Sequence, residues 1–185
     1  MLNLYPSPEL IAHCKQQLEE CSFGLRKTNN GTKEQQLVGL IGESLVKEQF
    51  DMPWVSCQDN YETEYDLLYE DLRIDIKTMG RNCYPKIDFV NNLVADQYKY
   101  NLDIYVFCSY HKTDNVLTLC GFTSKLLFNV YSKKYNQGTK RFRSDGSSFE
   151  LKSDLYEIHN YSINPINSIE EFKKDLLDYK LSEID

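Results

Sequence analysis

The sequence lacks any apolar run long enough to cross a bilayer, and its first residues lack the basic region and apolar core of a signal peptide. We therefore expect a soluble cytoplasmic protein with no membrane partner. Glycine and proline are also scarce, at 8 and 5 of 185 residues, and the hydrophobic share of 41% is ordinary. This composition excludes a disordered chain, and the length predicts a single domain over residues 1–185.

The sequence also lacks a pattern for zinc. None of the 3 histidines has a helical or short-loop spacing to another histidine or a cysteine. The 6 cysteines include no Cys-x-x-Cys pair, and most lie in apolar stretches, so we expect reduced core residues. They are Cys14, Cys21, Cys57, Cys83, Cys108 and Cys120.

An excess of positive charge is missing as well, because the net charge is −7. This balance argues against broad, nonspecific attraction to nucleic acid. Basic side chains nevertheless gather in one short region, which is either a solvated surface loop or a nucleic-acid contact with Tyr131 and Phe142 as stacking rings. The basic residues are Lys133, Lys134, Lys140, Arg141 and Arg143.

Hydrophobic periodicity predicts an α/β protein with a mixed central sheet flanked by helices. Ser7 and Pro8 are typical of a helix start, and a capping box at Thr32 predicts a second helix. The expected helices cover 7–21, 32–50, 93–101 and 123–130, with a last one from 168. The expected strands cover 54–57, 64–69, 72–78, 103–109, 116–120 and 155–158, and residues 132–148 are expected to form a surface loop.

The strands 64–69 and 72–78 predict a hairpin with a two-residue turn. If the turn occupies positions 70 and 71, Tyr69 pairs with Leu72. Counting back along both strands sets Asp66 opposite Asp75, with their Cβ atoms about 5 Å apart. Two facing carboxylates repel each other unless something compensates their charge, and a hard divalent cation such as Mg²⁺ is suited to that role.

Two further residues extend this acidic pair. Lys77 shares a strand face with Asp75 because side chains alternate along a strand. Glu43 lies in the second helix beside Gly39 and Gly42, two glycines whose cost to the helix indicates a close approach of its backbone to another element. The alternative for Glu43 is a surface ion pair one helical turn away, and the alternative for Asp75 and Lys77 is a solvated strand face.

The hairpin and the helix before it resemble the PD-(D/E)xK nuclease superfamily. The motif consists of Asp66, eight intervening residues and then Asp75-Ile-Lys77, and Glu43 lies in the preceding helix. The resemblance implies a restriction-endonuclease-like fold with an αβββαβ core at about 32–120, to which 7–21 and 123–182 are additions. Tyr65 stands at the nominal proline of the motif.

By this resemblance, the catalytic residues are Glu43, Asp66, Asp75 and Lys77, and the metal set is Asp66, Asp75, Glu43 and Ile76. Gln97 matches a polar position that points back to the site. The implied activity is nucleic-acid phosphodiester hydrolysis with Mg²⁺, or Mn²⁺ in its place, and we expect a DNA endonuclease. A homodimer is a reasonable expectation because cutting two strands needs two sites.

Two other functions stay open at this stage. One is a non-catalytic protein of the same fold that binds a partner protein or nucleic acid, with an acidic surface suited to a basic partner or to mimicry of nucleic acid. The other is a metal-dependent phosphodiesterase acting on small molecules, which the acidic composition suits. The sequence does not separate DNA from RNA or endonuclease from exonuclease, because substrate choice lies in loops.

Overall fold

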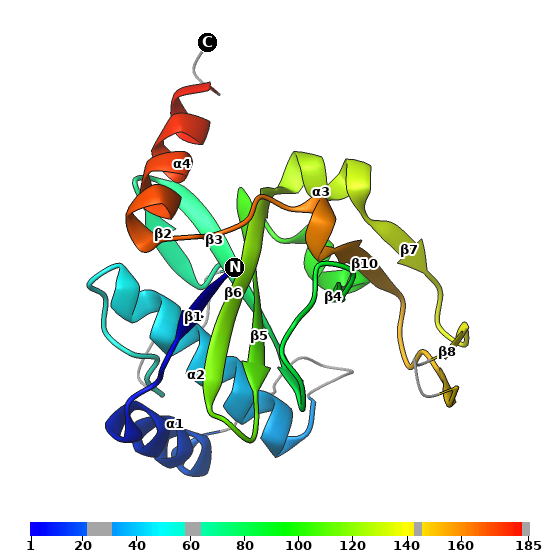
Figure 1. Cartoon of the computed structure of the whole chain (residues 1–185), viewed down its shortest axis with the longest axis horizontal. Coiled ribbons are helices and arrows are strands. Elements are labelled where there is room, and N and C mark those ends of the chain that lie inside the picture. Colours follow the sequence, from blue (N-terminus) through cyan, green and yellow to red (C-terminus); the bar gives the residue numbers. More distant parts are fainter. Residues whose placement is uncertain (22–30, 58–63, 143–145, 183–185) are drawn as a thin grey trace.

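A computed structural model describes residues 1–21, 31–57, 64–142 and 146–182. Its centre is a sheet of five strands in the order β1-β6-β5-β3-β2 (Figure 1). The strands are β1 (Leu2–Leu4), β2 (Leu67–Tyr69), β3 (Leu72–Arg81), β5 (Ile104–His111) and β6 (Val116–Ser124). β3 and β5 run parallel and the other neighbours antiparallel. The expected α/β class with a mixed sheet is confirmed.

Helices α1 (Pro8–Glu20), α2 (Lys33–Gln49) and α4 (Ile169–Ser182) contribute to the core on one face of this sheet, which we call the first face. The predicted starts of α1 and α2 are confirmed. Ser7 Oγ accepts a hydrogen bond of 3.0 Å from the Leu10 N–H. Thr32 and Gln35 form the reciprocal capping box of α2. No helix in the described part of the chain is long and apolar enough to span a membrane.

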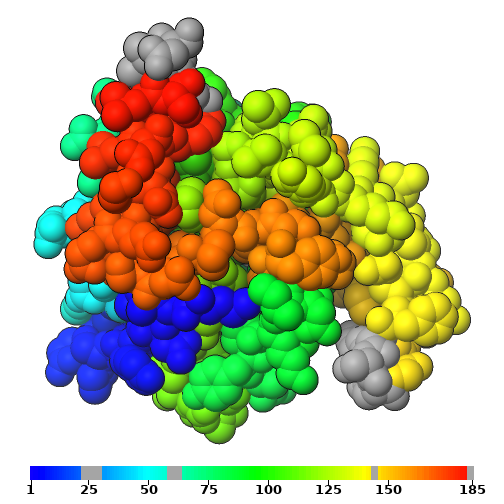
Figure 2. All heavy atoms as spheres, turned by 45° about the horizontal axis from the view of Figure 1, so that its top comes forward, coloured from blue at the N-terminus to red at the C-terminus, as the bar shows by residue number. Residues whose placement is uncertain are grey.

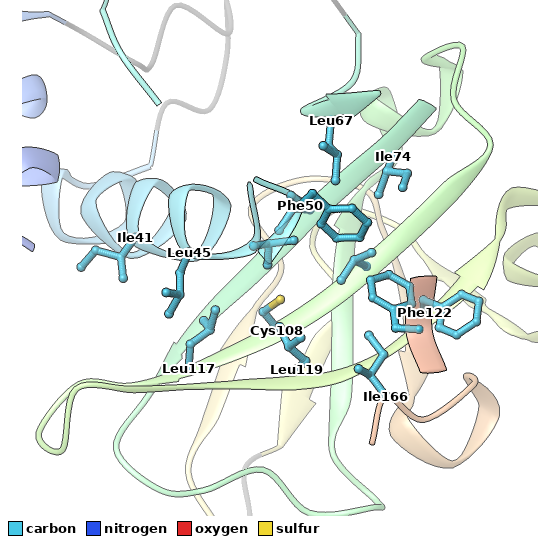
Figure 3. Close-up of a cluster of buried hydrophobic side chains, with 14 of the residues drawn as sticks. Ile41, Leu45, Phe50, Leu67, Ile74, Cys108, Leu117, Leu119, Phe122 and Ile166 are labelled. Carbon is cyan, nitrogen blue, oxygen red and sulfur yellow. The ribbon is translucent and has the colours of Figure 1, made fainter. Parts of the chain in front are cut away.

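The core of the first face is mainly aliphatic. Ile41 and Leu45 of α2 share this buried cluster with Ile74 of β3 and Leu117 of β6 (Figure 3). Burying such side chains contributes roughly 1.5–3 kcal/mol each to folding. The first face therefore fixes α2, and with it Glu43, against the sheet.

The opposite, second face is mainly aromatic. Tyr105 and Phe107 of β5 lie with ring centroids 4.8 Å and 6.0 Å from that of Phe128. Phe128 belongs to α3 (Lys125–Tyr131). A small antiparallel sheet adds Leu93 from β4 (Val90–Val94) and Ile158 from β10 (Leu155–His159), with β7 (Lys133–Tyr135) pairing with β10 on its other side. β8 (Lys140–Phe142) and β9 (Ser148–Glu150) form a hairpin that projects to one side (Figure 1).

Several predicted elements of the second face are wrong. The expected helix over 93–101 is instead β4 followed by the 3₁₀ helix η1 (Ala95–Lys99), because β4 pairs along its whole length with β10. The expected loop at 132–148 contains β7 and β8 and reaches β9. A second 3₁₀ turn, η2 (Asn160–Ser162), follows β10.

Other boundaries also differ from the prediction. Residues 54–57 form no strand, since the Val55 N–H donates to Ser44 Oγ at 3.1 Å rather than to a neighbouring strand. The strand expected over 64–69 is shortened to β2, whereas β3 runs past the expected end at 78. The third strand after α2, β4, belongs to the small sheet, so the expected αβββ order does not lie in one sheet.

The expectation that all cysteines are reduced core residues is wrong at three positions. Cys21 and Cys57 form a disulfide across 36 residues, with Cα atoms 6.0 Å apart, joining the end of α1 to the segment after α2. Cys83 is free but exposed. Spacing along the chain does not reveal such a pair, because folding alone brings the two residues together. The remaining three cysteines are buried and free, as expected.

Candidate functional site

The β2–β3 hairpin has the predicted turn. Glu70 and Asp71 adopt left-handed backbone conformations with φ of 49° and 67°, as a two-residue hairpin turn requires. Tyr69 pairs with Leu72, which confirms the predicted register. The ladder ends at the pair of residues 67 and 74, one step before the expected pair of Asp66 and Asp75.

Asp66 therefore lies at an open edge of β3, just beyond the short strand β2. Its N–H donates to the carbonyl of Ile74 at 3.0 Å. Its Oδ2 accepts the N–H of Ile76 at 2.7 Å. A carboxylate thus takes the place of a strand partner for this part of β3, and its position is fixed by the backbone.

Asp75 and Lys77 lie two residues apart on β3 and interact directly, since Lys77 Nζ is 2.6 Å from Asp75 Oδ1. Asp75 is only 3% exposed. A buried carboxylate is costly unless a partner compensates its charge, and Lys77 supplies the compensating charge here. The predicted shared face of these two side chains is the second face, where Asp75 lies beside Tyr105 of β5.

Tyr105 is a neighbour of the site that the sequence did not indicate. Burial raises the pKa of its phenol well above the ordinary value, and the charge of Asp75 raises it further. Its hydroxyl is buried and has no hydrogen-bond partner among the described residues. Only the parallel pairing of β3 with β5 places Tyr105 beside Asp75, and a hydrophobic pattern does not reveal that pairing.

Glu43 reaches the same group of charges from α2. Burial raises the pKa of its carboxyl from 4.5 to about 8, and the charge of Asp66 adds to this shift. The cations of Lys47 and Lys77 oppose it. Lys47 Nζ is 3.1 Å from Glu43 Oε1, so the expected contact one helical turn away is also present, and it becomes an ion pair when Glu43 is ionised. Glu43 thus interacts electrostatically with residues of the β2–β3 hairpin.

The close approach expected of the two glycines applies to one of them. A Cβ atom at Gly42 would lie 2.0 Å from Thr78 Oγ1 of β3, which leaves no room for a side chain. A Cβ atom at Gly39 would meet nothing within 4 Å. Gly42 therefore allows α2 to lie directly on β3, and this contact positions the adjacent Glu43.

The donors of this site are oxygen atoms, the ligands that Mg²⁺ and Mn²⁺ prefer. They comprise the carboxylates of Glu43, Asp66 and Asp75, and Ile76 has only its main-chain carbonyl to offer. Within the described ranges, no group of three or more histidine, cysteine, aspartate or glutamate side chains already has the arrangement of a metal site. Each acid instead has a partner within the chain: Lys47 for Glu43, Lys77 for Asp75 and the Ile76 N–H for Asp66.

Two residues of the basic region interact within the chain. The guanidinium of Arg141 pairs with the buried carboxylate of Glu157 and lies 4.2 Å from the ring centroid of Tyr135. Lys134 Nζ is 3.4 Å from Asp154 Oδ2. These contacts hold β7 and β8 against β10, so part of the basic charge is structural.

The other basic residues are more accessible. Lys133 and Lys140 are exposed, and each ammonium lies over a ring of its own strand. Phe142, at the end of β8, is exposed as well. Arg143 lies outside the described residues. Gln97 is buried in η1 rather than in a helix of the expected length.

Comparison of the chain with protein-family models, with curated proteins and with solved structures finds no match.

Proposed function

We propose that the chain is a metal-dependent nuclease that hydrolyses phosphodiester bonds of nucleic acid, with DNA as the expected substrate. One observation carries this proposal. Gly42 sets α2 directly on β3 beside Thr78, and this places Glu43 close enough to Asp66 and Lys77 for their charges to shift the pKa of its carboxyl, so acids and a lysine form one group. Lys77 in turn binds Asp75. A group of acids and a lysine at a sheet edge is better explained by phosphodiester chemistry than by an ordinary solvated strand face.

The proposed cofactor is Mg²⁺, with Mn²⁺ as a substitute, held by Glu43, Asp66, Asp75 and the carbonyl of Ile76. A carboxylate has about four lone-pair sites, so one hydrogen bond leaves it able to bind a cation. The raised pKa of Glu43 fits this role, because a site of clustered acids holds a proton until a cation replaces it.

A bound Mg²⁺ would lower the pKa of a water molecule and polarise the scissile phosphate. The chain's own residues supply the rest. Lys77 is a cation next to Asp75, placed to orient the attacking water and to offset charge on the phosphate oxygens. Asp75 holds the Lys77 ammonium in place, and Asp66 is held by the Ile76 N–H.

The projecting β8–β9 hairpin is the proposed nucleic-acid contact. Lys140 and Phe142 are exposed on it, a combination that suits a phosphate and a stacked base. Arg141 contributes less directly because it is paired with Glu157. Gln97 and Arg143 remain candidate contacts from the sequence.

We also propose that the core is a variant of the restriction-endonuclease-like fold. Helix α2 on a mixed sheet, followed by a hairpin with the acids and lysine, supports this assignment. The placement of β4 outside the main sheet is a departure from the expected core.

The second candidate is a non-catalytic protein of this fold that binds a partner. It is favoured by the contacts of Glu43 with Lys47 and of Asp75 with Lys77, which give two of the acids a partner without a metal.

Cleavage of supercoiled plasmid, single-stranded DNA and RNA with Mg²⁺ or Mn²⁺ tests the proposal. We expect activity that EDTA abolishes and that Asp75→Asn and Lys77→Met each lower by about 10²-fold or more. The control is Asp96→Asn, because Asp96 forms a similar but exposed pair with Lys99 at 3.3 Å. Full activity in Asp75→Asn would contradict the assigned site. No cleavage together with no metal binding would favour the non-catalytic candidate.

A further inference from the structure

Arg81, the last residue of β3, differs from the other arginines of the described residues because its guanidinium has no carboxylate partner. Arg73 donates two hydrogen bonds to the carboxylate of Asp103. Arg141 pairs with Glu157. Within the described ranges, no acid forms an ion pair with Arg81. A cation that is partly buried without an opposite charge is costly, so its presence at the end of β3 calls for an explanation.

The guanidinium of Arg81 is held in place by neutral groups. Its Nη2 donates to the carbonyl of Val90 at 2.7 Å, and its central carbon lies 4.9 Å from the ring centroid of Phe89. Its Nε is buried and has no hydrogen-bond partner among the described residues. Burial lowers the pKa of the guanidinium, and only the thiols of Cys120 and Cys83 oppose this shift. The group is therefore fixed in position but still lacks a counter-charge.

Arg81 is only half-buried, and the loop that follows it lies on the surface. Figure 2 shows this green segment beside the blue N-terminal strand. Tyr84 of the loop is exposed, and its ring centroid lies 4.6 Å from that of His111. His111 in turn pairs with Arg81 across β3 and β5. A guanidinium near an exposed ring is a combination that suits the phosphate and the base of a nucleotide.

We propose that Arg81 binds a phosphate group of a nucleic-acid strand, at a place separate from the scissile bond. A guanidinium presents a planar fork of N–H donors that matches phosphate oxygens. Arg81 shares a face of β3 with Asp75 and Lys77, and the distance along the strand from Lys77 to Arg81 is about 13 Å. The inference rests on the proposed function, since it takes nucleic acid as the ligand, but it does not depend on cleavage.

The first test is the affinity for single-stranded and duplex oligonucleotides in EDTA, measured by fluorescence anisotropy over a series of salt concentrations. Loss of one phosphate contact lowers the slope of log affinity against log salt concentration by about 0.7–0.9. We expect this change in Arg81→Gln, with binding weakened about fivefold or more. Lys15→Gln is the matched control, because it removes the same charge from an exposed position on α1. An unchanged slope in a folded Arg81→Gln variant would overturn the proposal.

The second test uses the wild type, so it does not depend on the folding of a variant. The arginine Nε–H resonances are followed by NMR during titration with an oligonucleotide and, separately, with inorganic phosphate. We expect the Arg81 signal to shift with both ligands and the Arg73 signal to stay, because Asp103 already occupies the Arg73 guanidinium. No shift of the Arg81 signal with the oligonucleotide would overturn the proposal, and a shift with inorganic phosphate alone would point to a small phosphate ligand instead.

The two tests also separate this inference from the proposed function. Oligonucleotide binding that depends on Arg81, without cleavage when Mg²⁺ or Mn²⁺ is added, would support the phosphate site and contradict the nuclease. Cleavage by a wild type whose Arg81 signal does not shift would contradict the phosphate site alone.

Discussion

The two faces of the central sheet are built in different ways. The first face is mainly aliphatic and draws on helices α1, α2 and α4. The second face is mainly aromatic and draws on short strands and the seven-residue helix α3. Helical periodicity and caps are local signals, so the helices of the first face were predicted. On the second face, the expected helix over 123–130 and strand over 155–158 correspond to α3 and β10. Strands β4 and β7 were not expected, because their pairing with β10 joins segments far apart in the chain.

The candidate site lies where the two faces meet. Glu43 comes from a helix of the first face, whereas Asp75 and Lys77 point to the second face, beside Tyr105. Asp66 lies on the open edge between them. The proposed site therefore depends on the packing of both faces, which positions its residues, and on the balance of charges among those residues.

The largest effect on stability should come from the disulfide that ties α1 to the segment after α2. Replacing Cys21 and Cys57 by serine frees a loop of 36 residues and should lower the free energy of unfolding by about 3–4 kcal/mol. Urea denaturation under oxidising conditions measures this. Cys83→Ser is the control, because that cysteine is exposed and free. Equal stability of the wild type with and without reductant would show that the first face does not depend on this bond.

A smaller effect should follow from a methyl group between α2 and β3. Gly42→Ala places a Cβ atom against Thr78, and we expect a loss of about 1–3 kcal/mol as the helix moves outward. Gly39→Ala is the matched control, since it has free space and should be neutral or stabilising by up to about 1 kcal/mol. Thermal or urea unfolding distinguishes them. If both variants behave alike, the close approach does not fix the position of Glu43.

Glu43, at the boundary between the two faces, should make the stability of the protein depend on pH. Because the pKa of Glu43 is raised from 4.5 to about 8, the folded state keeps a proton that the unfolded state has already released. The contribution of Glu43 to the free energy of unfolding is therefore full below about pH 4.5, and it is lost as pH rises through about 8. Glu43→Gln should remove this fall of the unfolding free energy with pH, as measured by urea denaturation at a series of pH values. An unchanged pH dependence would mean that Glu43 is ordinarily ionised.

The smallest effect should separate two buried tyrosines on the two faces. Tyr105→Phe removes a hydroxyl without a partner in the described structure and should be neutral or stabilising by up to about 1 kcal/mol. Tyr110→Phe on the first face removes a hydrogen bond of 2.8 Å to Asn115 and should lower stability by about 1 kcal/mol. Unfolding free energies of the two variants test this. The opposite order would mean that the Tyr105 hydroxyl has a stabilising role near Asp75.

The sequence was informative where one short segment determined the geometry. The turn at Glu70 and Asp71 set the hairpin register, and the caps at Ser7 and Thr32 set two helix starts. It was uninformative where distant segments meet. The disulfide, strand β4 and the position of Tyr105 all depend on contacts between separate parts of the chain, which periodicity does not encode.

The most direct test of the central claim is calorimetric titration of Mn²⁺ near neutral pH, in buffers of different ionisation enthalpy. We predict one binding event that releases a proton, because Glu43 with its raised pKa must ionise to hold the cation. Asp75→Asn should weaken binding by at least about tenfold, and Glu43→Gln should bind without releasing that proton. No binding by the wild type, or equal affinity in Asp75→Asn, would contradict a metal site formed by α2 and the β2–β3 hairpin.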